Sequence, residues 1–430
     1  MNLILLIIIF CIFAIILISY ASKNLDFVAI SLLGCFIAAT ITGLLGGIDI
    51  RGFIGYIEFE AIIVILCMSI ITKLAQDSNI LEFLAVKLFK FSKGNRRLFF
   101  YLICIITTLL AAIISDAVVV LILAPVIIRL CRFLKIRAGT YLLGMTICIN
   151  IGSIITPFSS GENIIISVAF GLDTLYFVIY YWGFSFFLLF VTIFLMDKFL
   201  LRKEPEIEED QKKFVLELIN SDIMISNKKL FYINSIGILI TIILFAVLPF
   251  LYLTAALSAF TLILINKKYT KKSTSDLLKD VEWEIIFFFI SLYVVIGCLT
   301  AAGFEELFTG IPFDVLDPFM LSLVILIIVS LVSGFVANTP TALIFIPIIE
   351  FLQGKFPSIP LLYSFIIGIN LGGNLIPQGA ACDMMTLKIA QKHDVENMNF
   401  KRLLKVGATF AIIHIILAIG YLFLLSLFFG

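Results

Sequence analysis

The sequence predicts an all-α polytopic membrane protein made of two inverted repeats. Its composition, a duplicated polar motif and the placement of its basic residues carry this prediction. Of the 430 residues, 62% are hydrophobic and 14% are charged, against about 25% charged residues in ordinary soluble domains. Many apolar stretches approach the roughly 20 residues that cross a bilayer as a helix. The composition therefore excludes a soluble protein, and the charges lie in the loops rather than in one patch that could bind nucleic acid.

One polar motif occurs twice, about 220 residues apart. In each copy an acid or amide, Asp116 or Asn338, is followed about nine residues later by a proline. Each copy continues with an Asn-x-Gly sequence and a second proline, in segments 150–157 and 370–377. Two halves that carry Gly- and Pro-interrupted apolar segments are typical of secondary transporters whose site lies between the repeats.

Basic residues cluster in five segments, which predicts that these segments lie on the cytoplasmic side. The segment 98–130 has bases at both ends, is too short for two spans, and carries Ser115 and Asp116 near its middle. We therefore expect a re-entrant hairpin with these residues at its tip, which is allowed at that depth where protein or water covers it. The segment 319–350 has acidic flanks and predicts a second hairpin, which enters from the opposite face with Asn338 at its tip.

About ten spans are expected besides the two hairpins. Two of them, 138–170 and 360–390, contain the Gly/Pro interruptions and should each break into two half-helices, because proline removes a backbone donor and clashes with the preceding turn. The remaining spans are expected near 3–20, 28–46, 57–73, 174–196, 230–248, 251–266, 282–301 and 404–428.

This order divides the chain into two repeats and their connections. Each repeat holds a scaffold span, a hairpin and a broken helix, and the second repeat also holds the last span. The predicted units are N-terminal helices at 1–56, a first repeat at 57–197, a partly helical cytoplasmic linker at 198–229, a helix pair with its loop at 230–281, and a second repeat at 282–430.

Carboxylates at membrane depth are costly, so those in the interrupted segments are functional candidates. Asp116 lies in an apolar run, whereas Glu162 and Asp383 each begin a second half-helix, where a carboxylate is also an ordinary N-terminal cap. Neighbouring amides and hydroxyls suit a sodium ion or an anion, and half-helix ends suit ions of either sign. The predicted binding residues are Ser115, Asp116, Asn150, Gly152, Thr156, Ser159, Ser160, Glu162, Asn163, Asn338, Thr339, Asn370, Gly372, Asn374 and Asp383, with Asp116, Asn150, Asn338 and Asn370 as the expected sodium ligands.

Other polar groups are expected to be solvated or structural. Lys73 and Asp77 lie at the end of one span, and Glu60 and Glu284 also lie at span ends. The eight cysteines form no CxxC pair and there are only two histidines, so neither a disulfide framework nor a transition-metal site is expected. No cofactor is predicted beyond a bound sodium ion. No zinc motif or nucleophile elbow is present, so an enzyme is not expected.

At these motifs the chain resembles the ion transporter superfamily, which includes arsenite permeases, NhaD-type sodium/proton antiporters, and citrate, dicarboxylate and sulfate carriers. The similarity covers about 58–171 and 282–395. The resemblance implies a multi-pass protein of a prokaryotic plasma membrane that moves a small inorganic ion or a small anion by alternating access. Homodimers are common in that group. The matching residues are Asn338 with Pro347, and Asn150, Gly152, Thr156, Pro157 and Asn163.

Three acids depart from the pattern of that superfamily. Asp116 stands where it usually has Asn, Glu162 stands at a usually neutral position, and Asp383 replaces the Asn expected from symmetry with Asn163. No Lys or Arg lies within the motifs, so a di- or tricarboxylate pocket here would repel its substrate. The acids favour a cation-linked transporter, most simply a sodium/proton antiporter with Asp116 holding the ion. An arsenite or other oxyanion or carboxylate permease, coupled to sodium or protons, is the alternative. A channel is disfavoured by the paired broken helices.

Overall fold

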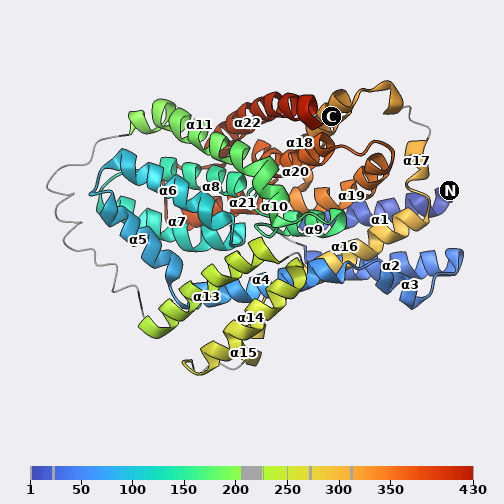
Figure 1. Cartoon of the computed structure of the whole chain (residues 1–430), viewed down its shortest axis with the longest axis horizontal. Helices are drawn as coiled ribbons and strands as arrows, with labels where there is room; N and C mark the ends of the chain where they lie inside the picture. Colours follow the sequence, from blue (N-terminus) through green and yellow to red (C-terminus); the bar gives the residue numbers. More distant parts are fainter. Residues whose placement is uncertain are drawn as a thin grey trace.

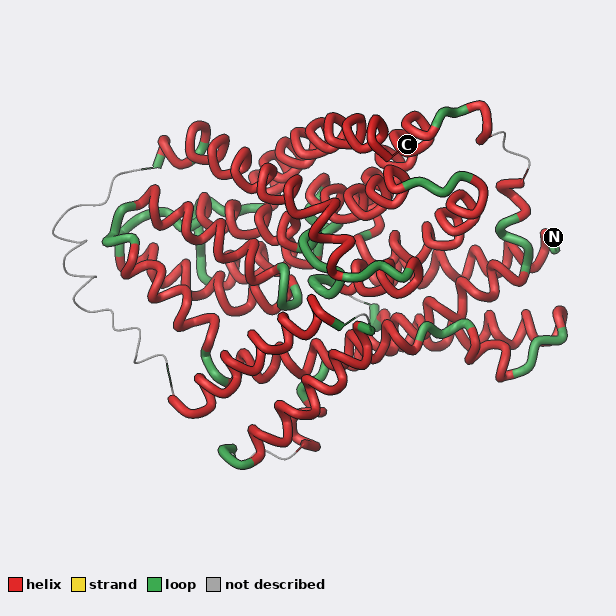
Figure 2. Tube along the Cα trace, viewed as in Figure 1, coloured by secondary structure: helices red, strands yellow, loops and turns green. Residues whose placement is uncertain are grey.

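The computed structural model is all-helical in the part of the chain that it describes, which is residues 2–21, 25–204, 225, 227–248, 250–270, 274–309 and 313–429 (Figures 1 and 2). No strand occurs in these ranges. Within them, 8 helices are long and apolar enough to cross a membrane, and shorter apolar helices accompany them. The prediction of an all-α polytopic membrane protein is therefore confirmed.

The chain begins with two long apolar helices joined by a short connection. Asp26 caps the second of them by accepting a hydrogen bond from the backbone N–H of Ala29 at 3.0 Å, and Gly47 ends it in the left-handed region at φ +67°, where glycine carries no steric penalty. The elements up to the first repeat are α1 (Leu3–Ala21), α2 (Phe27–Gly46), the short α3 (Ile50–Gly55) and α4 (Phe59–Asp77).

The first predicted hairpin is a pair of helices whose turn contains Ala112 to Ser115. Asn95 starts the first arm, because its side-chain oxygen accepts hydrogen bonds from the N–H groups of Arg97 and Leu98, and Asp116 starts the second arm. The next span is broken after Gly152, as the motif predicts. The elements are α5 (Ile80–Phe91), the hairpin arms α6 (Arg96–Ala111) and α7 (Asp116–Phe133), and the half-helices α8 (Gly139–Gly152) and α9 (Gly161–Phe170).

The span expected at 174–196 is one long helix with an unpredicted π-helical turn at Val178–Trp182. The predicted helical character of the linker at 198–229 falls mainly on 205–224 and 226, which lie outside the described residues. The elements are α10 (Thr174–Phe177), α11 (Gly183–Phe199), a 3₁₀ turn (Leu201–Lys203), α13 (Lys228–Val247), α14 (Leu251–Lys267) and α15 (Thr274–Lys279).

The later part of the chain repeats the order of long helix, hairpin and broken helix. Its hairpin changes direction at Ala337, and its broken span stops after Gly372 and resumes at Ala381. The elements are α16 (Trp283–Ala301), α17 (Glu306–Thr309), the hairpin arms α18 (Pro318–Val336) and α19 (Asn338–Lys355), the half-helices α20 (Ile359–Gly372) and α21 (Ala381–Lys392) with a 3₁₀ turn (Gly373–Leu375), and α22 (Phe400–Phe429).

The two repeats share one close packing contact between a broken helix and the first arm of its hairpin. A methyl group at Gly152 would lie closer than 3.0 Å to the backbone oxygen of Thr108 in α6, and one at Gly372 would lie equally close to the backbone oxygen of Ser330 in α18. Real Cβ atoms are essentially never found at such distances. The glycine of each Asn-x-Gly motif therefore lets two helix backbones touch. The residue boundaries of the repeats, 57–197 and 282–430, stay a proposal that this equivalence supports.

The buried apolar residues form two clusters that define two bodies. One cluster joins α5 to α8 and α11 with α18 to α22. The other joins α1, α2, α4, α14 and α16; α4 and α14 lie in the lower part of Figure 1, and α1, α2 and α16 lie in its right half. Buried residues of α9 belong to both clusters, since Ile166 packs in the first and Ile164 and Ile165 pack in the second. We call these clusters the hairpin body and the scaffold body.

Candidate functional site

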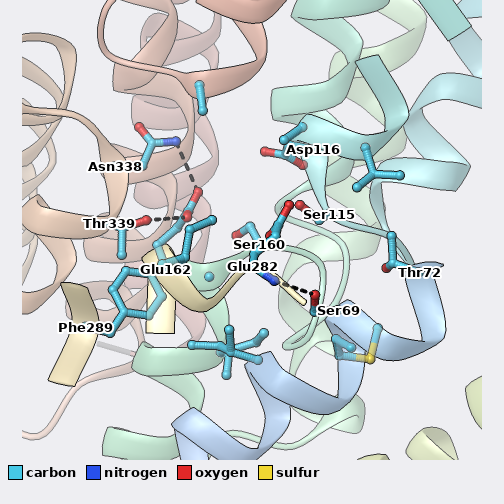
Figure 3. A pocket seen from close by; sticks show the side chains of 18 of the residues that line it. Ser69, Thr72, Ser115, Asp116, Ser160, Glu162, Glu282, Phe289, Asn338 and Thr339 are labelled. Atoms are coloured by element: carbon cyan, nitrogen blue, oxygen red, sulfur yellow. Dashed lines mark hydrogen bonds between the residues drawn. The ribbon is translucent and has the colours of Figure 1, made fainter. Parts of the chain in front are cut away.

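A cavity of about 200 Å³ lies where the two hairpin tips meet the start of α9 (Figure 3). Each of these three segments is a break in helical structure that the duplicated motif predicts. Helices α7, α9 and α19 all begin there, so three N-termini with partial positive charge face the space. Of the predicted site residues, seven line this cavity: Ser115, Asp116, Ser159, Ser160, Glu162, Asn338 and Thr339.

Glu162 connects the two repeats at the centre of the cavity wall. Its side chain is only 5% exposed. The amide of Asn338 donates to Oε1 at 3.1 Å, and the hydroxyl of Thr339 donates to Oε2 at 3.2 Å. Figure 3 shows these two donors on one side of the carboxylate and Asp116 on the other. The Ser160 side chain caps α9 by accepting from the N–H of Asn163 at 3.4 Å. The carboxylate is thus fixed where α9 of the first repeat meets the hairpin tip of the second.

Asp116 is the second carboxylate of the cavity and begins α7. The Ser153 hydroxyl lies 2.8 Å from Oδ1 and 3.0 Å from Oδ2, so it donates to this carboxylate. Among the described residues, no base forms an ion pair with Asp116 or Glu162. Two converging carboxylates without a basic partner attract a cation or a proton.

The amides of the broken helices lie behind the cavity and bind one another. Asn163 donates to the backbone oxygens of Ser153 at 2.5 Å and Thr156 at 3.0 Å, and it accepts from the amide of Asn370 at 2.9 Å. Asn150 donates to Asn374 Oδ1 at 2.6 Å. These bonds hold the two interrupted helices to each other across the repeats. Asn370 Oδ1 and Asn374 Nδ2 have no hydrogen-bond partner.

The first break is held by side chains that replace the missing helical hydrogen bonds. Thr156 donates through its hydroxyl to the backbone oxygen of Ala112 at 2.6 Å, which fastens the break to the turn of the first hairpin. Trp182, in the unpredicted π-helical turn, donates from its ring N–H to the backbone oxygen of Ile155 at 2.9 Å. Sequence reasoning missed this contact, because no local pattern marks a π-helical turn.

The tip of the second hairpin is conformationally strained. Ala337 has φ +86° and ψ 158°, a region that is essentially restricted to glycine and costs other residues about 1–3 kcal/mol. The following residue is held in place, since the N–H of Asn338 donates to the backbone oxygen of Gly379 at 3.2 Å. The strained backbone conformation at Ala337 places the Asn338 side chain within hydrogen-bonding distance of Glu162.

Eight predicted site residues do not line the cavity. Asn150, Thr156, Asn163, Asn370 and Asn374 belong to the network behind it, Gly152 and Gly372 are helix contacts, and Asp383 is buried beside Thr146. In the described part of the chain, no group of three or more His, Cys, Asp or Glu side chains could hold a metal ion. A cation in the cavity would therefore be bound by carboxylates together with hydroxyls and amides.

Lys73, Asp280 and Glu282 line the cavity although sequence reasoning did not place them there. The Lys73 ammonium lies 3.2 Å from Asp280 and 3.5 Å from Asp77, and the Asp280 side chain is 44% exposed. The prediction that Lys73 and Asp77 are merely solvated was incomplete, whereas Glu60 and Glu284 are exposed as expected.

These residues mark the mouth of the cavity, since they are the more exposed end of its lining. Lys73 comes from α4, and Asp280 and Glu282 come from the connection between α15 and α16, so no motif relates them in sequence. The one sequence feature that pointed to this region was the similarity of segment 58–60 (Glu-Phe-Glu) to segment 282–284 (Glu-Trp-Glu).

Part of the cavity wall is aromatic. Tyr20 stacks on Phe288 with ring centroids 4.7 Å apart, and Phe27 meets Phe288 edge-on at 5.5 Å. With Phe289, these rings belong to the scaffold helices α1, α2 and α16 and line the cavity. The Tyr20 hydroxyl and the Ser69 and Thr72 hydroxyls of α4 are the neutral oxygens on this side, whereas the Asp116 and Glu162 carboxylates belong to the first hairpin tip and α9.

Comparison with known proteins identifies relatives along most of the chain. The sequence pattern of the citrate transporter family, CitMHS, matches residues 4–368. A 46 kDa membrane protein of Mycobacterium leprae is 25% identical over 378 residues, which is 86% of this chain and 86% of that protein. An uncharacterized transporter of Synechocystis sp. is 24% identical over 416 residues, 90% of this chain and 91% of its own length.

The fold also resembles that of a solved structure. The YdaH transporter of Alcanivorax borkumensis, described as having an unusual topology, superposes with a TM-score of 0.59. The alignment covers 91% of this chain and 88% of that chain at 10% sequence identity. At this identity the likeness shows the fold alone.

Proposed function

The chain belongs to the citrate transporter family and is a multi-pass membrane transporter, and on this premise we propose that it couples transport to a cation bound by Asp116 and Glu162. The simplest such activity is sodium/proton antiport. The observation that carries the proposal is the convergence of the two carboxylates in one cavity where no base pairs with either among the described residues.

The electrostatics of the cavity favour a cation. Two ionised carboxylates at membrane depth are costly unless a positive charge or protons neutralise them. The helix N-termini at α7 and α9 offset part of this charge, since Asp116 and Glu162 lie in the first turns of these two helices. A sodium ion would find carboxylate oxygens there, with the Ser115 and Ser160 hydroxyls nearby.

Antiport follows if the same carboxylates bind a sodium ion in one half of the cycle and protons in the other. Two protons neutralise both carboxylates, whereas one sodium ion leaves a single negative charge that the N-termini of α7 and α9 partly offset. The cavity lies between the hairpin body and the scaffold body. Movement of one body against the other would then open the cavity to one side of the membrane at a time.

A second candidate function is uptake or export of a small carboxylate, coupled to the same cation. Three features favour it: the family is described as citrate transporters, three helix N-termini face the cavity, and Lys73 stands at its mouth. An anion would then bind only after a cation had neutralised Asp116 and Glu162. Lys73→Gln should weaken anion-dependent flux in this case and leave antiport without an anion largely intact.

The test uses purified protein in liposomes that contain a pH-sensitive dye and carry an imposed proton gradient. Sodium, lithium or potassium is added first, and citrate, succinate, sulfate or arsenite follows. Proton movement triggered by sodium alone supports antiport. If no cation triggers proton movement and the dye responds only after an anion is added, antiport is overturned in favour of the permease. Glu162→Gln should abolish either signal, and Glu60→Gln, which changes an exposed carboxylate, is the matched control.

A further inference from the structure

A third carboxylate, Asp383, is buried outside the cavity, in the first turn of α21. Its side chain is 1% exposed. The Thr146 hydroxyl of α8 donates to Oδ1 at 2.6 Å, and Thr386 lies behind that hydroxyl at 3.4 Å. Among the described residues, Asp383 forms no ion pair. The Thr146 hydroxyl, the weakly donating Cys382 thiol 4.0 Å from Oδ1 and the N-terminus of α21 offset only part of a buried negative charge, so a bound proton stabilises this carboxylate.

The equivalent position in the first repeat carries no charge. Asp383 follows Asn370 by the same interval that separates Asn163 from Asn150. Asn163 uses its amide to satisfy the backbone oxygens of the first break. A neutral side chain is therefore sufficient for the structural task at this position. The acid in the second repeat adds the capacity to bind and release a proton.

The groups around Asp383 are acidic or uncharged. The nearby acids are Asp116 at the start of α7 and Glu162 at the start of α9, which interact electrostatically with the first turn of α21. The neighbouring thiol, Cys382, precedes Asp383 on α21. The bases of the elements packed against it do not face it. Lys388 and Lys392 of α21, Arg129 and Arg132 of α7, and Lys401 and Lys405 of α22 are exposed, and Arg402 of α22 interacts with Glu204.

Asp383 is connected to the cavity by its own segment of chain. Ala381 and Gly379 line the cavity, and Gly379 accepts the backbone hydrogen bond of Asn338. The Cys382 thiol lies 3.4 Å from Asn150 Oδ1 in the network between the broken helices. The carboxylate therefore lies two residues along the chain from a residue of the cavity wall.

We propose that Asp383 is a proton-binding site separate from the cavity, and that its proton is exchanged for the cation held by Asp116 and Glu162. The proton is taken from water that enters the cavity, rests on a carboxylate oxygen of Asp383, and returns to water when a cation occupies the cavity. The proposal rests on the proposed function for its role in transport, but the protonation of Asp383 is measurable without transport.

Infrared difference spectroscopy of the purified protein between acidic and alkaline pH tests the site directly. The wild type should show a protonated-carboxyl band that titrates with pH, and Asp383→Asn should lack one such band. Asp383→Glu should restore a band at a shifted frequency. Thr146→Val should change the midpoint of the titration, because it removes the hydroxyl that contacts the carboxylate, whereas Thr146→Ser should leave it unchanged. A spectrum of Asp383→Asn that is identical to the wild type overturns the proposal.

The coupling is tested by the apparent sodium affinity, measured as sodium-dependent thermal stabilisation over a range of pH. One competing proton weakens sodium binding by up to about tenfold per pH unit. The slope of the logarithm of apparent sodium affinity against pH gives the number of protons released per sodium ion bound. In Asp383→Asn this number should therefore fall by about one. An unchanged slope overturns the coupling. If sodium stabilises neither protein while the infrared band is still lost, the proposed antiport fails and the proton site stands.

Discussion

Replacing Asn163 with Ala tests how much the amide network contributes to holding the interrupted helices. This side chain is fully buried. Its Nδ2 group donates to the backbone oxygens of Ser153 and Thr156 and lies 3.3 Å from the Ser159 hydroxyl, while its oxygen accepts from Asn370. The substitution removes all of these bonds and leaves a small void.

The size of the effect follows from which partners lose their last hydrogen bond. The Ser153 and Thr156 oxygens still lie 2.6 and 2.8 Å from the Ser159 hydroxyl and share its single proton, and Asn370 still donates to the Ile366 oxygen. No partner is left wholly unsatisfied, so each lost bond costs near the ordinary net value of about 0.5–1.5 kcal/mol rather than the full desolvation penalty. Three to four bonds together predict a loss of about 2–5 kcal/mol.

The measurement is equilibrium unfolding of the purified variant in mixed micelles, compared with the wild type. Ser159→Ala is the matched control, because it removes a neighbouring hydroxyl whose two acceptors, Ser153 and Thr156, keep the Asn163 amide. It should cost about 1 kcal/mol. A loss below about 1 kcal/mol for Asn163→Ala would refute the idea that this amide secures the first break.

Asp116→Asn should abolish cation-dependent transport while the protein still folds, because the amide retains the shape of the carboxylate but not its charge; wild-type flux in liposomes would remove Asp116 from the site. Gly372→Ala should lower stability by about 1–3 kcal/mol, since its methyl group would meet the Ser330 oxygen, whereas Gly420→Ala, with open space around it, should be tolerated; equal melting temperatures would contradict this. Ala337→Gly should raise stability by about 1 kcal/mol, because relief of strain exceeds the entropy cost of glycine; a lower melting temperature would show that the tip is not strained.

The hairpins and broken helices were predictable because their signals are local. Pro and Gly interrupt helices wherever they occur, and a polar tip between two apolar arms marks a turn. The contacts made by Gly152 and Gly372 with a hairpin arm were not predictable in detail, since a glycine does not show which backbone approaches it. The motif therefore indicated the breaks but not the helix pairing that requires them.

The candidate site was predicted in part for the same reason. Asp116, Glu162 and Asn338 lie at the breaks that the motif marks, and the structure brings them to one cavity. Lys73 and Asp280 were missed because neither lies in an interrupted segment. Lys73 lies in the last turns of α4 and Asp280 directly follows α15, far away in the sequence. The pairing of Asn150 with Asn374 was also hidden, since an asparagine at a break suits a ligand role and a structural role equally well.

The division of the cavity into a polar side and an aromatic side has a kinetic consequence. Asp116, Glu162 and Asn338 come from the hairpin tips and α9, while α1, α2 and α16 present rings and α4 adds the Ser69 and Thr72 hydroxyls. When the two bodies slide past each other, the ligands on the two hairpin tips travel as a set, and only a ligand supplied by α4 has to be exchanged. The energy barrier of the movement then depends on how easily the aromatic surfaces slide and on the few ligands exchanged at α4.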